Sequence, residues 1–202
     1  IFLSNIFVDP FSWWSDWKKL MGNVDKDNEP YSVLGELISY DYLLKNNKDP
    51  VWEGPESGTY DICTDAFDCE VKSTTVKGNK SVTISNINQL DAHKKPLHLY
   101  YCCFERSESG KSIEDILDVL KSHGENVEEL ERKLTTLGYP QGTSGRAIKY
   151  RLLSINDYII NDDFPKIVPS SFKEGVIPLG IERITYIVSL SGIASVAINY
   201  EL

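Results

Sequence analysis

The spacing of apolar residues along the chain predicts three helices set between short strands. The first helix is expected over 31–44, where Pro30 stands near the start and apolar residues recur at helical spacing. The second and third are expected after Ser112 and after Asn126, because each of these residues is a favoured N-cap and an acid stands three positions later. Gly138 is placed to end the third helix.

Runs of strand-forming residues lie between the first helix and the second. The segments 60–63 and 67–72 are expected to pair as a hairpin around a turn at 64–66, and 81–84 is expected to form a third strand. Residues 97–104 (LHLYYCCF) are almost continuously apolar. That pattern is typical of a central strand that is covered on both faces.

The chain after the third helix is predicted to return to strands. These strands are expected over 147–160 and 181–190, with a proline-bearing stretch at 164–178 between them. A short helical turn is expected at 86–90 and a loop at 140–145. The mixture of helices, hairpin and buried strand predicts an α/β or α+β fold in which helices pack against a sheet.

Composition places the chain among ordinary globular proteins. Of its 202 residues, 41% are hydrophobic and 25% are charged, which is enough to build a sizeable core. No run of about 18 apolar residues occurs, so no membrane span is expected. The formal net charge of −9 argues mildly against avid, non-specific binding of nucleic acid, although local charge around a site matters more than the sum.

The chain is expected to divide into a front segment and a main domain. Residues 1–30 would be an aromatic-rich extension or the end of a preceding domain, and 31–202 would be the main domain. The aromatic residues of the front segment are expected to pack on a core or a partner rather than stack on bases. The first eight residues lack the features of a signal peptide, and the chain lacks an initiator Met, so we expect a piece of a longer protein.

The cysteines and histidines suggest no catalytic or metal site of their own. None of the cysteines forms a CxxC pair, so reduced thiols buried in a cytoplasmic protein are expected at Cys63, Cys69, Cys102 and Cys103. No serine or cysteine triad context surrounds His93, His98 or His123. His98 lies inside the apolar run and is expected to be a core residue with a hydrogen-bond partner.

The candidate chemistry lies in the predicted hairpin. Side chains alternate along a strand, so Asp68, Glu70 and Lys72 share one face. Asp61 on the paired strand reaches the same place if the register allows it. Two carboxylates can hold Mg²⁺ or Mn²⁺, and a lysine beside the metal can orient water and stabilise the transition state of phosphodiester hydrolysis.

Glu36 is a further candidate on the first predicted helix. Its neighbours in sequence are mostly apolar, and a carboxylate buried among them needs a partner such as a metal. Two plainer interpretations stay open: Glu36 faces solvent, and the Glu-x-Lys pair is a solvated strand face with a weak ion pair. Four lysines close to these residues in sequence could contact phosphates: Lys77, Lys80, Lys94 and Lys95. It is equally open that they are ordinary surface residues.

The order and spacing of several short motifs resemble the restriction-endonuclease-like superfamily, and more narrowly the bacterial PD-(D/E)XK motif protein family. The resemblance covers roughly 34–193, and the segments that carry it are Gly35-Glu36-Leu37, Trp52-Glu-Gly-Pro55, Asp61, Glu70-Val-Lys72-Ser-Thr, Ile84-Ser85, Gln89-Leu90, Leu137-Gly138-Tyr139 and Asp163-Phe164-Pro165. Tyr60 replaces the proline of the family motif, which has no chemical role. The resemblance implies a restriction-endonuclease-like core with a central mixed β-sheet flanked by helices.

The resemblance also implies roles for individual residues. Asp61 and Glu70 would be metal ligands, Lys72 the catalytic lysine, Glu36 the helix acid that completes the site, and Gln89 a polar residue near the metal or a phosphate. Val71 would also be a metal ligand, through its main chain, because its side chain has no ligand atom. Asp68 lies outside the matching pattern but could substitute as a ligand.

Two hypotheses of different class follow. The first is a Mg²⁺- or Mn²⁺-dependent endonuclease that cleaves DNA in restriction or phage defence, with other defence proteins as candidate partners and a two-fold homodimer suited to double-strand cleavage. The second is a catalytically inactive module of the same fold that binds nucleic acid or partner proteins; the acidic net charge and the aromatic front segment favour it. No substrate-pocket signature supports a third idea, a different metal hydrolase.

Overall fold

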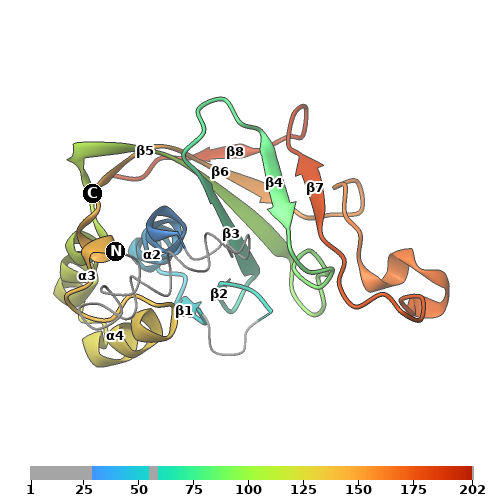
Figure 1. Cartoon of the computed structure of the whole chain (residues 1–202), viewed down its shortest axis with the longest axis horizontal. Helices are drawn as coiled ribbons and strands as arrows, with labels where there is room; N and C mark the ends of the chain where they lie inside the picture. The colour runs from blue at the N-terminus through green and yellow to red at the C-terminus, as the bar shows by residue number, and fades with distance from the viewer. Residues whose placement is uncertain (1–28, 55–58, 202) are drawn as a thin grey trace, which may run out of the picture.

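A mixed six-stranded sheet forms the centre of the protein (Figure 1). The computed structural model describes residues 29–54 and 59–201. The strands follow the order β1-β2-β3-β5-β6-β8, and β3 and β5 are parallel while every other neighbouring pair is antiparallel. Their bounds are β1 (Val51–Trp52), β2 (Ile62–Cys63), β3 (Asp68–Thr74), β5 (Leu97–Lys111), β6 (Tyr150–Ile159) and β8 (Val196–Ile198).

Strand β5 is central because both of its faces are apolar. Tyr100, Cys102 and Phe104 enter a core beneath the helices, whereas Leu97, Leu99 and Tyr101 enter a second core on the opposite face. This division follows from the alternation of side chains along a strand. It confirms the prediction that 97–104 is a strand covered on both sides.

Three helices cover one face of the sheet (Figure 1): α2 (Pro30–Lys45), α3 (Ile113–Ser122) and α4 (Val127–Thr136). Helix α2 lies against β3 at Gly35, where an added Cβ would stand 2.2 Å from the Ser73 Oγ. The absence of a side chain at Gly35 therefore sets how closely α2 approaches the strand that carries the candidate chemistry.

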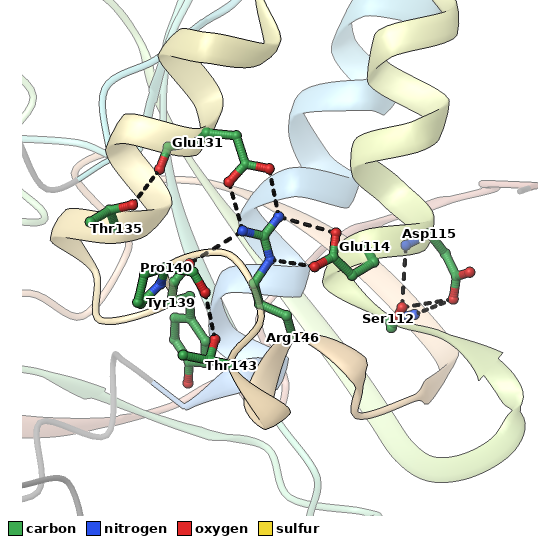
Figure 2. Close-up of polar contacts among 9 residues, drawn as sticks. All are labelled: Ser112, Glu114, Asp115, Glu131, Thr135, Tyr139, Pro140, Thr143 and Arg146. Carbon is green, nitrogen blue, oxygen red and sulfur yellow. Dashed lines mark hydrogen bonds and ion pairs between the residues drawn. The ribbon is translucent and has the colours of Figure 1, made fainter. Parts of the chain in front are cut away.

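The caps of α3 and α4 form as the sequence predicts. Ser112 and Asp115 make a reciprocal capping box, and the Asn126 side chain accepts hydrogen bonds from two main-chain N–H groups of the first turn of α4. The loop that follows α4 returns between the two helices and inserts Arg146, whose side chain binds Glu114 of α3 and Glu131 of α4 (Figure 2).

A small antiparallel sheet covers the other face (Figure 1). It pairs β4 (Ser81–Ile84) with β7 (Tyr186–Ser189). Val82, Ile84 and Val188 from this pair pack in the second core with residues of β5. The described part of the chain has no helix with the length and apolar character needed to cross a bilayer.

The predicted helices and strands form with changed limits, residues 86–90 form a turn, and the loop expected over 140–145 ends in a short 3₁₀ helix, Ser144–Ala147, that was not predicted. The strand expected over 97–104 continues to Lys111, and the strand expected over 181–190 forms only over Tyr186–Ser189. Strands β1 and β8 were not predicted, because segments of two or three residues are too short to show a period of two. The expectation for the aromatic front segment falls on residues 1–28, outside the described part of the chain.

Candidate active site

The hairpin of β2 and β3 brings Asp61 to the main chain of β3. Ile62 pairs with Cys69, so Asp61, which precedes Ile62, arrives beside Glu70. The Asp61 Oδ2 accepts a hydrogen bond of 2.6 Å from the main-chain N–H of Val71. The N–H and C=O of one strand residue point to the same edge, so the Val71 carbonyl also faces the Asp61 side.

Glu70 and Lys72 form a buried ion pair on β3. The Lys72 Nζ lies 3.0 Å from the Glu70 Oε1, and the two side chains are only 11% and 2% exposed. Their register partners on β5 are Leu99 and Tyr101, which belong to the second core. The interpretation of this pair as a solvated strand face is therefore wrong.

Glu36 faces the interior from α2. The residue is 8% exposed, which contradicts the interpretation that it faces solvent, and its Oε2 accepts a hydrogen bond of 2.8 Å from the Trp52 Nε1. Burial raises the pKa of Glu36 well above its ordinary value, and the negative charges of Asp61 and Glu70 raise it further. The Trp52 hydrogen bond and the charge of Lys72 lower that pKa, but they do not offset the rise.

Asp61, Glu70 and Lys72 therefore all lie near enough to Glu36 to influence the pKa of its carboxyl group. The carboxylate oxygens of Glu36, Asp61 and Glu70 are the ligand type that hard divalent cations prefer, and a bound cation would relieve the repulsion among these acids. Within 29–54 and 59–201, however, no three side chains of His, Cys, Asp or Glu are grouped to hold a metal ion. The donor set fits a cation in chemical kind, with the main-chain oxygen of Val71 as a further ligand beside the carboxylates.

Gln89 and Asp68, the two other polar candidates, each have local contacts of their own. The Gln89 side-chain oxygen accepts a hydrogen bond of 2.9 Å from the Ser85 main-chain N–H, which orders the loop after β4. Asp68 pairs in register with Cys63, and its charge contributes, after burial, to raising the pKa of the Cys63 thiol to about 11.

Two of the candidate phosphate-binding lysines have structural contacts. The Lys95 Nζ donates a hydrogen bond of 2.5 Å to the Thr64 carbonyl, and the Lys77 Nζ pairs with Glu105 at 2.5 Å. Lys80 lies in the loop just before β4, and Lys94 lies in the loop between β4 and β5. Lys95 and Lys77 therefore hold neighbouring segments of the chain together.

The cysteines and His98 match their predicted character in part. All four cysteines are free thiols; Cys69 and Cys102 are buried, whereas Cys63 and Cys103 are partly exposed, contrary to the expectation that all are buried. The His98 Nδ1 lies 2.8 Å from the Asp157 Oδ1, so this histidine has the partner that the sequence predicted.

Sequence reasoning missed the structural importance of Trp52 and of Lys133. Lys133 of α4 is 6% exposed, and its Nζ donates a hydrogen bond to the Trp52 main-chain carbonyl. No periodic signal marks a lysine on an amphipathic helix as buried, so only the tertiary contact identifies it.

A mixed sheet flanked by helices, with acids on a hairpin and a lysine two residues beyond one of them, defines the class of PD-(D/E)XK nuclease-like folds. A family model described as "Putative PD-(D/E)XK family member, (DUF4420)" matches residues 8–191, and the chain belongs to this family. No curated protein matches the chain, and no solved structure matches it.

Proposed function

We propose that the protein is a Mg²⁺- or Mn²⁺-dependent endonuclease that hydrolyses DNA phosphodiester bonds. The observation that carries the proposal is the burial of the Glu70–Lys72 ion pair beside Asp61 and Glu36. Buried charges are costly to maintain for stability alone, and titratable groups with perturbed pKa values concentrate at functional sites. Membership of the PD-(D/E)XK family supports a nuclease as the activity.

The metal would be held by the carboxylates of Asp61 and Glu70 and the main-chain carbonyl of Val71, with Glu36 as the helix acid that completes the site. When bound, the cation would neutralise charge that develops on the phosphoryl oxygens. Lys72 carries a positive charge in a site from which water is largely excluded, so it can orient the attacking water and stabilise the transition state. Gln89 could donate from its amide nitrogen to a phosphate oxygen.

We also propose the setting of the reaction. The sequence resemblance favours a role in restriction or phage defence in the cytoplasm, with DNA as the substrate and other defence proteins as partners. The formal net charge of −9 means that the chain does not attract phosphate through its overall field. We therefore expect binding to DNA to depend strongly on the divalent cation, and a homodimer would suit cleavage of both strands.

A plasmid nicking assay with Mg²⁺ or Mn²⁺ tests the proposal. We expect the wild type to nick DNA and Lys72→Ala and Glu70→Gln to lose the activity by a factor of about 100 or more, because each removes charge stabilisation from the site. Tyr200→Phe is the matched control: it removes a hydrogen bond to the buried acid Asp41 elsewhere on α2. Equal activity in the wild type and the two site variants would defeat the proposal.

The alternative function is an inactive module of the same fold that binds nucleic acid or partner proteins. The observation that favours it is the lack, in the described residues, of three acidic, histidine or cysteine side chains grouped for a metal. This alternative predicts no heat of Mg²⁺ or Mn²⁺ binding by calorimetry and unchanged DNA binding after addition of a chelator.

A further inference from the structure

Trp52 makes the hydrogen bond that fixes Glu36. The indole is 2% exposed, and its Nε1 donates to the Glu36 Oε2 at 2.8 Å. An indole has one N–H and no acceptor, so it can serve the carboxylate only as a single donor. The hydrogen bond therefore restrains one oxygen of Glu36 and with it the rotation of the whole carboxyl group.

The indole is itself restrained by the chain around it. Gly54 adopts a positive φ of +55°, and an added Cβ at Gly54 would stand 3.3 Å from the Trp52 ring, so the chain turns closely over the indole. Trp52 pairs in register with Ile62, and the main-chain N–H of Glu53 donates to the Asp61 carbonyl at 3.0 Å. The segment that carries Trp52 thus also holds the backbone of Asp61.

Helix α4 secures this segment from the outside through Lys133. The Lys133 Nζ donates to the Trp52 main-chain carbonyl and lies 5.9 Å from the centre of the Trp52 ring, within range of a cation–π interaction. The same ammonium group pairs with Glu129 at 3.2 Å. A continuous series of contacts therefore runs from α4 through β1 to the acid on α2.

We propose that Trp52 is a positioning residue, which fixes the orientation of the Glu36 carboxylate relative to the hairpin that carries Asp61 and Glu70, and that Lys133 anchors Trp52 for this purpose. The inference rests on the proposed metal-dependent activity. Without the indole N–H, the Glu36 Oε2 loses the donor that fixes its orientation, and the carboxyl group can rotate. Hydrogen-bond partners that orient metal ligands commonly change metal affinity or activity by 10- to 100-fold when they are removed.

The test compares Trp52→Phe with Tyr200→Phe. Trp52→Phe keeps an aromatic ring but removes the N–H, whereas Tyr200→Phe removes an O–H donor that binds the Asp41 Oδ2 at 2.6 Å on the same helix. Crystal structures of both variants without metal would show the position of the Glu36 carboxylate, and calorimetry would measure Mn²⁺ affinity. We expect Trp52→Phe to displace the carboxylate and to weaken Mn²⁺ binding by about 10-fold or more, and Tyr200→Phe to do neither.

The two readouts separate this inference from the proposed function. If wild-type protein binds no Mn²⁺, the metal-dependent function fails, while the position of Glu36 in metal-free Trp52→Phe still decides the positioning role. A Glu36 carboxylate that keeps its place in Trp52→Phe would overturn the inference, as would Mn²⁺ affinity equal to that of a binding-competent wild type.

A second measurement applies even if Trp52→Phe does not fold. The Trp52 indole N–H resonance in the wild type should move in Glu36→Gln, because a neutral amide replaces a carboxyl acceptor. A resonance that stays unchanged would overturn the inference.

Discussion

Arg146 provides a sharp test of the electrostatics that hold the helical layer together. Its side chain is fully buried between α3 and α4 (Figure 2). The guanidinium contacts Glu131 at 2.6 and 2.8 Å through two nitrogens and Glu114 at 2.8 and 3.1 Å. The acids differ from the arginine in one respect: the Glu131 and Glu114 side chains are 29% and 47% exposed.

This difference predicts that losing an acid costs more than losing the arginine. In Glu131→Ala the guanidinium stays buried and loses the carboxylate that binds it in a bidentate manner. We expect this loss to lower the free energy of unfolding by about 3–5 kcal/mol. In Arg146→Met the apolar side chain fills most of the space and both acids can regain water, so we expect a loss of only about 1–2 kcal/mol.

Urea unfolding at pH 7 measures the order of the two variants, because urea leaves ion pairs unscreened while guanidinium salts do not. Glu128→Ala, on the exposed first turn of α4, is the control for loss of an acid. An Arg146→Met variant at least as destabilised as Glu131→Ala would refute the reasoning.

The same pair predicts a dependence on pH. The hydrogen bonds from Arg146 hold the pKa of Glu131 below its ordinary value of 4.5. A lowered pKa in the folded state means that the pair stabilises the fold above the ordinary pKa and that this stability is lost as the pH falls through the folded pKa. The stability difference between wild type and Glu131→Gln should therefore shrink below about pH 4.5.

Three further predictions concern the site and the core. Lys72→Met leaves Glu70 buried without its ion pair, so it should cost about 3–5 kcal/mol in urea unfolding; a loss below about 1 kcal/mol would show that the pair is solvated. Glu36→Gln should stabilise the metal-free protein. Because the pKa of Glu36 is raised in the folded state, the wild type loses stability as the pH rises above the ordinary pKa of 4.5, and the variant should not show this loss. Parallel profiles of stability against pH for the two proteins would contradict the assignment. Burial raises the pKa of the Cys102 thiol to about 12, so a thiol reagent at pH 8 should spare Cys102 in native protein and label it after denaturation; rapid labelling in native protein would contradict its burial.

Local patterns predicted those parts of the fold whose causes lie close together in the sequence. The caps at Ser112 and Asn126 need only residues three positions away, and the apolar run 97–104 carries its own signature of a strand covered on both faces. The hairpin also places Glu70 and Lys72 together, because the spacing of two residues on a strand fixes a shared face.

Other features depend on contacts between distant segments. The Trp52–Glu36 hydrogen bond joins β1 to α2, and Arg146 joins a loop to two helices, so neither has a repeating signal in the sequence. The burial of Lys133 is of the same kind, since an amphipathic pattern assigns a lysine to the exposed face. The sequence identified the candidate acids, whereas the residues that surround them became known only from the structure.

The most direct measurement of the central claim is a crystal structure of the protein grown with Mn²⁺, in which anomalous scattering locates the ion. We predict one Mn²⁺ in contact with the carboxylates of Asp61 and Glu70, and its loss in Glu70→Gln. Mn²⁺ bound only elsewhere, or no Mn²⁺ at this hairpin under saturating conditions, would contradict the assignment of the site.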